Sequence, residues 1–460
     1  MMTADVYGEV VWRALFPAWE RGLRRRPTLS LLRDLEAGQR RPREVIEGDQ
    51  LAALARLLAH ASANVPHYRA QMRRAGIAPD DVASLDDLGR LPILSRAEAQ
   101  AAGDALLSTA PPISSIRKTT GGTTGEPLVV RYDAGSEHWR QAVKLRAFGW
   151  AGYRVGRRAI HYWGRPTRPD FRLRSRAKQA ADRAIKREHY IDCTDRSEAA
   201  LNRATALIRR IQPGFLFCYA QAGADLARHI HRDRARAWDD IAVICGAEAL
   251  FDADREAIAG AFGPHVFQTY GCREVMLIAS ECEVHAGLHV AMENVIVELI
   301  VRGPDGVRPA RPGEIGEVVL TDLHNYGMPL IRYANGDLAS WLADDSPCPC
   351  GRGHRRLAHV DGRVTDALRD GHGNRVGGMV FNLIFSPLAD HVRRFQATQH
   401  ADGSIRVKIV PRGRLSPEVS THVRELCARY LPGIRVTLEP VDTIALSPSG
   451  KHRVTAQVSS

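Results

Sequence analysis

The alternation of strand-like and helix-like segments after about Arg117 constrains the fold more than any other feature of the sequence. Short runs rich in β-branched and aromatic residues are separated there by glycine-rich turns and by helical stretches. Such alternation is typical of an α/β core with a largely parallel sheet, because parallel strands need a crossover connection between them. The runs that predict strands are residues 128–132, 241–245, 265–269 and 293–301.

The segments on either side of this core have patterns of their own. In the first 100 residues, leucine and alanine recur at helical spacing after Asp49, which we interpret as a helix N-cap. After Gly362, residues 394–409 alternate like two strands around an Asp-Gly turn. Ser416 and Pro417 then begin a helix, which a further strand follows. This tail has the pattern of a compact α+β unit.

These patterns predict an α/β protein with a large N-terminal domain, containing mainly parallel sheets and helices, and a small α+β C-terminal domain. The length of 460 residues, about twice that of a single-core domain, agrees with more than one core. The predicted divisions are a helical part (1–100), a ligand-binding core (101–361), a hinge (362–366) and the small domain (367–460).

Composition narrows the class of ligand. Lysine and arginine number 64 against 52 aspartates and glutamates, which gives a formal charge of +12 and favours an anionic ligand or partner. Residues 154–187 hold twelve of these basic side chains, enough to contact nucleic acid or a phosphorylated ligand. Aromatic residues are not interleaved among them in a stacking pattern. We therefore interpret the run as a solvated helix with its loop and expect no nucleic-acid partner.

The sequence also bears on location. No apolar run approaches the roughly 18 residues that a membrane helix needs, and the opening residues lack a basic region followed by an apolar core. Eight cysteines are too few for a disulfide scaffold. We therefore expect a cytoplasmic protein without a membrane partner.

The strongest local motif is KTTGGTTGEP at residues 118–127. Consecutive glycines allow backbone N–H groups to wrap around an oxyanion, and the threonine hydroxyls add donors. No Lys-Ser or Lys-Thr pair follows the last glycine, so the motif is not a Walker loop. An ordinary polar turn rarely needs such a sequence, and the motif predicts a phosphate-binding loop.

Three further motifs contain residues suited to a nucleotide site. In QTYGCRE, Tyr270 offers a flat face for a base, and Glu274 can hold a divalent cation near phosphates. Asp337 follows a glycine turn in RYANGD and can accept two ribose hydroxyls. Lys451, beside a glycine in SPSGKHR, can bring its charge to a developing oxyanion. Taken alone, these motifs are equally compatible with strand ends and a basic tail.

The order of the motifs resembles that of the adenylate-forming superfamily of acyl- and aryl-ligases and luciferases. The shared elements are the Thr/Gly loop, Y-G-x-x-E, R-Y-x-x-G-D, G-R-x-x-D from Gly362 and the terminal G-K-x-x-R. Within this superfamily the chain looks most similar to the phenylacetate–coenzyme A ligase branch, including relatives encoded with capsular polysaccharide genes. That likeness rests on VPHYR (65–69), LPIL (91–94), YGCRE (270–274), MPLIRY (328–333) and CPCGR (348–352).

The resemblance implies a role for each motif residue. The β- and γ-phosphates of ATP would be held by Thr119, Thr120, Gly121, Gly122, Thr123, Thr124 and Gly125. Adenine would be bordered by Gly246, Ala247, Glu248, Tyr270 and Gly271. Glu274 would bind Mg²⁺, and Asp337 would hold the ribose hydroxyls, with Arg363 close to the ribose and phosphate. Lys451 would reach the substrate carboxylate and the α-phosphate.

The resemblance also implies the reaction. Such enzymes form an acyl-adenylate and pyrophosphate, and then rotate a mobile C-terminal lid domain to admit an acceptor. The implied function is an AMP-forming ligase that activates a carboxylic acid, expected to be aromatic, and transfers it to coenzyme A. Alternative acceptors are an amine, a small nitrogen nucleophile or the pantetheine of a carrier protein, and a homodimer is an open alternative to a monomer. The competing class is a non-catalytic nucleotide or nucleic-acid binder on the same scaffold.

Cysteine and histidine residues predict a possible zinc site. Cys282, His285, Cys348 and Cys350 offer three thiolates and an imidazole, a set able to close a tetrahedral Zn²⁺ site. His289 is an alternative to His285. The other interpretation is a tight cysteine turn near a buried thiol. Four protein ligands leave no position for substrate, so we expect any zinc here to be structural.

Overall fold

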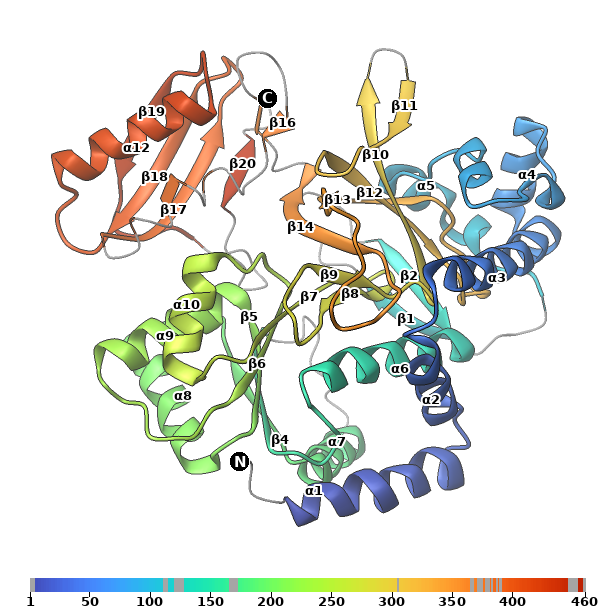
Figure 1. The fold of residues 1–460 in the computed structure, drawn as a ribbon, viewed down its shortest axis with the longest axis horizontal. Coiled ribbons are helices and arrows are strands. Elements are labelled where there is room, and N and C mark those ends of the chain that lie inside the picture. Colours follow the sequence, from blue (N-terminus) through green and yellow to red (C-terminus); the bar gives the residue numbers. More distant parts are fainter. Residues whose placement is uncertain are drawn as a thin grey trace.

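The structure is a computed structural model that describes residues 5–110, 115–119, 128–164, 173–303, 306–364, 368–369, 375–376, 381, 384–385, 388, 391–445 and 454–457. Figure 1 shows a large body built around one long sheet, with the C-terminal unit at one corner. Within the described segments, no helix combines the length and apolarity that crossing a bilayer requires.

Helices make up the N-terminal part, as expected. They are α1 (Val6–Val10), η1 (Val11–Leu15), η2 (Ala18–Leu23), α2 (Thr28–Gly38), α3 (Arg43–Asn64), α4 (Pro66–Ala75) and α5 (Arg96–Ala102), with short 3₁₀ turns between α4 and α5. The interpretation of Asp49 as an N-cap is wrong, because α3 begins at Arg43. Ile46 and Gln50 are already buried on the face that continues with Leu54, so the buried stripe extends beyond its leucine-rich part.

The large body contains a twelve-stranded sheet in the order β11-β10-β12-β13-β14-β9-β8-β7-β6-β5-β3-β4. In chain order the strands are β3 (Ala159–Trp163), β4 (Glu188–Asp192), β5 (Phe215–Tyr219), β6 (Ala242–Gly246), β7 (Val266–Cys272), β8 (Met276–Glu281), β9 (Leu288–Val290), β10 (Val295–Gly303), β11 (Gly306–Pro309), β12 (Ile315–Asp322), β13 (Tyr333–Trp341) and β14 (Arg356–Arg363). Pairing is parallel from β4 through β3, β5 and β6 to β7, and antiparallel in the rest. The α/β class is confirmed, but the parallel pairing expected for most of the sheet is confined to the half where helices connect the strands.

Helices cover both faces of the parallel half. They are α6 (Ala134–Trp150), α7 (Leu173–Lys186), α8 (Glu198–Ile211), α9 (Ala220–Arg232) and α10 (Asp252–Phe262). Successive side chains of β5 point to opposite faces, so Leu216 packs with α8, α9 and α10, whereas Phe217 packs with Phe148 near the end of α6. A hairpin of β1 (Ser115–Thr119) and β2 (Val129–Asp133) precedes α6. The Asp133 carboxylate caps α6 by accepting from the backbone N–H of Ser136 at 2.8 Å.

The C-terminal unit has the expected α+β pattern. It contains β17 (Val392–Gln399), β18 (Ile405–Pro411), α12 (Pro417–Tyr430), β19 (Val436–Pro440) and β20 (Thr455–Gln457), after the short pair β15 (Leu368–Arg369) and β16 (Arg375–Val376). Its four-stranded sheet has the order β19-β18-β17-β20. The Ser416 hydroxyl accepts from the backbone N–H of Val419 at 3.3 Å and caps α12, as the sequence predicts. Residues 362–364 of the predicted hinge are described, and 365–366 lie outside the described residues.

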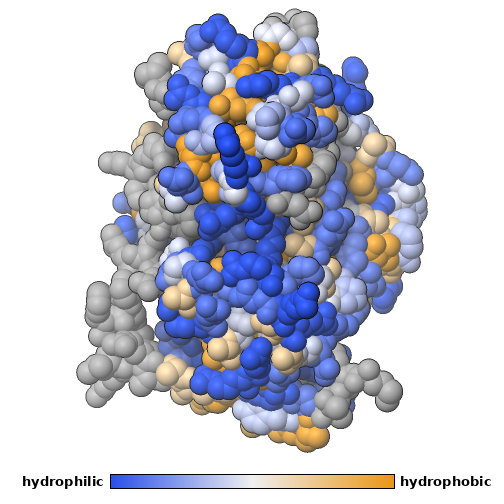
Figure 2. All heavy atoms as spheres, turned by 90° about the vertical axis from the view of Figure 1, so that its left-hand side faces the viewer, coloured by the Kyte–Doolittle hydropathy of each residue, from blue (hydrophilic) through white to orange (hydrophobic). Residues whose placement is uncertain are grey.

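Charged side chains join the C-terminal unit to the large body. Arg394 on β17 forms an ion pair with Asp225 on α9, and Asp225 also accepts from Arg196 at 3.0 Å. Figure 2 looks at the left-hand side of Figure 1 and shows a mainly hydrophilic surface where the two parts meet. A polar junction is typical of domains that move relative to each other.

Candidate nucleotide and metal sites

Two strands from different halves of the sheet, β7 and β13, bring Tyr270, Asn335 and Asp337 together. The Tyr270 hydroxyl donates to Asp337 Oδ2 at 2.8 Å, and the Asn335 amide donates to the same oxygen at 2.8 Å. The amide also lies 2.9 Å from the Tyr270 oxygen. All three side chains are buried. Burial and the nearby Asp337 charge raise the pKa of Tyr270 well above its usual value, so the phenol remains a hydrogen-bond donor.

Arg363 approaches the same carboxylate from β14. Its Nε lies 2.8 Å from Asp337 Oδ1, and the two residues face each other in the register between β13 and β14. Its Nη1 also donates to the carbonyl of Asn335 at 3.3 Å. The Asp337 charge raises the pKa of Arg363. A fixed positive charge therefore stands beside the carboxylate that the sequence assigns to ribose.

Glu274 lies in the turn between β7 and β8 and is buried. Its Oε1 accepts from the Tyr333 hydroxyl at 3.3 Å and lies 3.5 Å from Arg96 Nη1. Arg140 on α6 donates to the Glu274 carbonyl at 2.9 Å and is ion-paired with the buried Asp322. The position of Glu274 is thus held from several elements, and a carboxylate oxygen is a ligand that Mg²⁺ prefers.

Gly271 allows the tight approach of β7 and β8 that places this turn. The register shifts between Tyr270 and Gly271, which marks a β-bulge. An added Cβ at Gly271 would lie 2.2 Å from the carbonyl oxygen of Met276. Only glycine fits here without moving the opposite backbone. The residue assigned to the adenine border from the sequence therefore has a clear structural role.

The structure describes one end of the predicted phosphate loop. Thr119 ends β1, and its carbonyl accepts from Arg273 at 2.9 Å. This contact places the start of the loop beside the turn that carries Glu274. Residues 120–125 of the loop and Lys451 lie outside the described residues.

The residues assigned to the adenine border follow the end of β6. Gly246 is the last residue of that strand, Ala247 adopts a φ of +66°, and Glu248 accepts from a backbone N–H in the first turn of α9 at 3.0 Å. Because β6 and β7 are parallel neighbours, these residues and Tyr270 lie at the same carboxyl edge. Ligands of open α/β sheets bind at this edge.

Sequence reasoning missed several residues of this site. Asn335 lies two positions before Asp337, and residues two apart share a face of a strand, so its place in RYANGD was the available signal. Tyr333 belongs to the same strand face. Arg96 and Arg140 come from helices far away in sequence, and no local pattern indicates their contact with Glu274.

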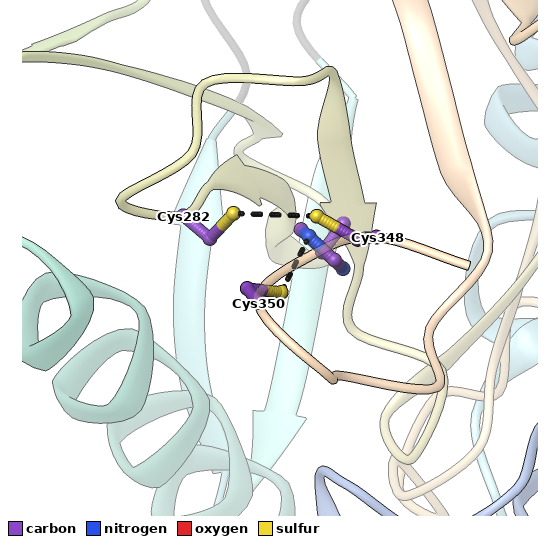
Figure 3. Close-up of side chains that lie close together, drawn as sticks. Cys282, Cys348 and Cys350 are labelled. Carbon is purple, nitrogen blue, oxygen red and sulfur yellow. Dashed lines mark hydrogen bonds between the residues drawn. The ribbon is translucent and has the colours of Figure 1, made fainter. Parts of the chain in front are cut away.

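The cysteine motifs meet beside β8 and β9. Cys282 Sγ lies 3.8 Å from Cys348 Sγ, and Cys350 Sγ lies 3.5 Å from His289 Nε2. The four ligand atoms all lie within 4.8 Å of one another. Figure 3 shows the three labelled cysteines pointing toward one another.

The histidine in this cluster is His289, which corrects the assignment of His285. His285 Nδ1 lies 3.2 Å from Glu281 Oε2 instead, and its φ of +56° belongs to a turn. His289 lies on β9, and its imidazole reaches the thiols from that strand. His289, the alternative ligand predicted from the sequence, is thus the histidine that lies beside the cysteines.

No protein-family model matches the chain. Curated relatives nevertheless share extended similarity with it. The chain is 27% identical over 334 residues to a phenylacetate–coenzyme A ligase of Thermus thermophilus, covering 71% of this chain and 72% of the relative. It is 26% identical over 410 residues to a phenylacetate–coenzyme A ligase of Escherichia coli K12, covering 84% and 85%.

Solved structures share the fold. A 2-hydroxyisobutyryl–coenzyme A ligase in complex with 2-HIB-AMP, in the postadenylation state, has a TM-score of 0.70 at 18% identity over 90% of both chains. The chain resembles the phenylacetate–coenzyme A ligases of the adenylate-forming superfamily.

This similarity supports an AMP-forming acid–thiol ligase. The same 2-hydroxyisobutyryl–coenzyme A ligase with 2-HIB-AMP and CoA, in the thioesterification state, has a lower TM-score of 0.57 at 18% identity over 91% of both chains. The fold of this chain is therefore more similar to the postadenylation structure than to the thioesterification structure.

Proposed function

We propose that the chain uses ATP to convert a carboxylic acid into an acyl-adenylate, with release of pyrophosphate, and then transfers the acyl group to coenzyme A. The observation that carries this proposal is the buried cluster of Tyr270, Asn335 and Asp337, with Arg363 beside it. Relatives named phenylacetate–coenzyme A ligase support the same reaction.

Asp337 would accept the ribose hydroxyls of ATP. Tyr270 and Asn335 contact one carboxylate oxygen and Arg363 contacts the other, so the group is oriented before a ligand arrives. The ring of Tyr270 and residues 246–248 would border adenine.

The phosphates would lie between the Thr/Gly loop and Glu274. Thr119 and residues 120–125 would surround the β- and γ-phosphates, and Glu274 would hold Mg²⁺. When bound, Mg²⁺ neutralises phosphate charge. Lys451 would contact the substrate carboxylate and the α-phosphate. Carboxylate and ATP are both anionic, so their approach needs this positive charge and correct positioning more than acid–base chemistry.

The proposal also covers the identity of the acid and of the acceptor. An aromatic acid is our first expectation, supported by the phenylacetate in the relatives' names. Coenzyme A is the first acceptor. An amine, a small nitrogen nucleophile and a carrier-protein pantetheine are the alternatives that the assay below separates.

We also propose that Cys282, His289, Cys348 and Cys350 hold a structural Zn²⁺. A tetrahedral site with Zn–S of about 2.3 Å and Zn–N of about 2.05 Å has S···S edges of about 3.75 Å and S···N edges of about 3.55 Å. The observed 3.8 Å and 3.5 Å match these edges. Backbone N–H groups of Val284 and Arg352 lie 3.5 Å from the sulfurs of Cys282 and Cys350, respectively, as they do around metal-bound thiolates.

The assay incubates the protein with ATP, Mg²⁺, one acid from an aryl and aliphatic panel, and one acceptor. We expect AMP and an acyl–coenzyme A thioester, identified by mass spectrometry, only when acid and coenzyme A are both present. Asp337→Asn should abolish most of this turnover, whereas Arg393→Met, an exposed change on β17, should not. AMP formed with an amine but not with coenzyme A would reassign the acceptor. ATP use that no acid stimulates would overturn the ligase proposal.

A further inference from the structure

A cavity of about 560 Å³ lies between α6, the parallel edge of the sheet and the N-terminal helices. Its lining comes from α6, from β3, β4 and β5, from the end of α7 and from the segment around Phe16 and Glu20. Figure 1 shows that α6, α7, β4 and the N-terminal helix, which contribute to this lining, lie near one another in the large body. The volume is that of a small-molecule site, and nothing in the nucleotide cluster around Tyr270 uses it.

Three parallel rings form one wall of the cavity. His161 on β3 stacks on Tyr190 of β4 at 4.4 Å and on Phe217 of β5 at 4.6 Å between ring centroids. Tyr153 meets Phe217 edge-on at 5.0 Å, and Phe148 lines the same side. Aromatic walls of this kind suit an aromatic ring of the ligand.

Polar groups enter the cavity from one stripe of α6. Glu137, Gln141, Lys144 and Phe148 follow helical spacing and all line it. Gln141 donates to Glu137 Oε1 at 2.7 Å, whereas Glu137 Oε2 is buried with no hydrogen-bond partner among the described residues. Within the same described part of the chain, no side chain forms a hydrogen bond or ion pair with the Lys144 ammonium. Burial lowers the pKa of Lys144.

The other charged groups of the lining are engaged locally. The contacts are Arg26 with Glu20 at 3.3 Å, Lys186 with Asp182 at 2.8 Å, and Glu188 with the hydroxyls of Tyr153 at 3.0 Å and Tyr190 at 3.4 Å. With Lys144 and Glu137 included, three basic side chains face four carboxylates. The lining therefore has one more carboxylate than basic side chains, so an anionic ligand group would lack a counter-charge here. A neutral group that donates to Glu137 and accepts from Lys144 would satisfy both side chains.

The cavity lies farther back along the parallel strands than their carboxyl edge, where residues 246–248 and Tyr270 lie. His161 and Phe217 lie two residues before Trp163 and Tyr219, on the same face of their strands and farther from the carboxyl edge. Ile116 on β1, the strand that leads into the predicted phosphate loop, also lines the cavity. An acid with its carboxylate at the edge can therefore extend its other end inward.

We propose that this cavity receives the distal end of the substrate acid, and that the substrate is an aromatic acid bearing a hydroxyl group that donates to Glu137 and accepts from Lys144. The inference rests on the proposed adenylation. A hydroxyl is the simplest neutral group with both hydrogen-bonding roles. A site built for a substrate hydroxyl rejects the analogue that lacks it by up to roughly 10⁴- to 10⁵-fold, because its buried polar groups then remain unpaired.

Matched acids test this selectivity with the full chain. The pairs are benzoate with 3- and 4-hydroxybenzoate, phenylacetate with 4-hydroxyphenylacetate, and cinnamate with 4-hydroxycinnamate, each followed by acid-dependent ATP–pyrophosphate exchange. We expect at least one hydroxy acid to exceed its parent by 100-fold or more in kcat/KM. Exchange with the parents at the same kcat/KM would overturn the inference and leave the proposed adenylation standing.

Two variants locate the selectivity in the cavity. Lys144→Met and Glu137→Gln should each reduce the preference for the hydroxy acid by at least 10-fold, whereas Lys408→Met on β18 should retain it. Equal losses for parent and hydroxy acid in both variants would contradict the inference.

Binding without turnover separates the two proposals. If no acid supports exchange, but 4-hydroxybenzoate or another hydroxy acid of the panel raises the Tm of the unaltered protein and not of Lys144→Met, the cavity assignment stands and the adenylation proposal falls. If the acids produce neither exchange nor a shift in Tm, both are wrong.

Discussion

The Tyr270 hydroxyl meets the Asp337 carboxylate at 2.8 Å although 67 positions separate the two residues in sequence. Tyr270 lies on the last parallel strand of the sheet, and Asp337 lies on an antiparallel strand of the other half. The candidate nucleotide site is therefore complete only when both halves of the sheet are assembled. Its geometry depends on the fold of the whole body more than on any single motif.

Loss of the Asp337 charge should weaken ATP binding. Asp337→Asn removes the ion pair with Arg363 and one charged acceptor for ribose, a loss of about 1.5–3 kcal/mol. We expect the Kd for ATP, measured by calorimetry, to rise roughly 10- to 150-fold. Tyr270→Phe keeps the ring and removes one donor, so its effect should be smaller. Wild-type affinity in Asp337→Asn would contradict the assignment of the ribose site.

Two glycine substitutions should have opposite effects on stability. In Gly271→Ala the new Cβ meets the Met276 carbonyl oxygen at 2.2 Å, which should lower the free energy of unfolding by roughly 1–3 kcal/mol. Gly260→Ala lies in α10 with no atom within 4 Å of the new Cβ, and should raise it by about 0.5–1 kcal/mol. Urea denaturation measures both. A Gly271→Ala protein as stable as wild type would show that the bulge does not need glycine.

Metal content distinguishes the two histidines near the cysteines. We expect about one zinc per chain by elemental analysis of protein purified without chelator. Cys350→Ser and His289→Ala should lose the metal, whereas His285→Ala should retain it, because His285 contacts Glu281 instead. Zinc lost from His285→Ala and kept in His289→Ala would reverse the assignment.

The free energy of unfolding should fall as the pH rises because of Asp361, a residue of β14. Burial raises the pKa of Asp361 from 3.8 to about 6, and its Oδ2 has no hydrogen-bond partner among the described residues. The folded state therefore holds this proton more tightly than the unfolded state, so stability present below pH 4 is lost as the pH rises to 6. Asp361→Asn should exceed wild type by roughly 2–3 kcal/mol at pH 7.5, and by much less at pH 4.5, in urea titrations. An unchanged difference between the two pH values would contradict this origin.

The ion pair between Arg394 and Asp225 should favour the adenylation step. Arg394→Met removes it, and we expect slower pyrophosphate exchange with little loss in the transfer of a preformed acyl-adenylate to coenzyme A. Arg393→Met changes the exposed neighbour on the same strand and should alter neither rate. Stopped-flow assays of the two half-reactions test this difference. Equal slowing of both would mean that the contact only stabilises the fold.

Two strands of the parallel half, β6 and β7, could be predicted from sequence because each contains a short apolar run, whereas β3, β4 and β5 were not predicted. The antiparallel strands from β8 to β14 could not be ordered in the same way, since their pairing depends on turns and on contacts between distant segments. Motif residues such as Tyr270 and Asp337 do meet in space, whereas their distant partners Arg96 and Arg140 carry no local signal.

Spacing alone also left the histidine of the metal cluster undecided. His285 and His289 both follow Cys282 closely, and only the turn at His285 and the strand β9 determine which imidazole reaches the thiols. The start of α3 was likewise not predictable from spacing alone. In α3 the leucine-rich part of the buried face could be recognised from the sequence. Gln50 lies on the same buried face but is polar, so the pattern did not predict that α3 begins before it.

Acid-dependent ATP–pyrophosphate exchange tests the central claim most directly, because it reports formation of an acyl-adenylate whatever the acceptor. The account predicts exchange that depends on one class of acid and that falls to background in Asp337→Asn and Lys451→Ala, while both variants remain folded. Exchange that persists unchanged in Asp337→Asn, or folded protein that does not bind ATP, would contradict it.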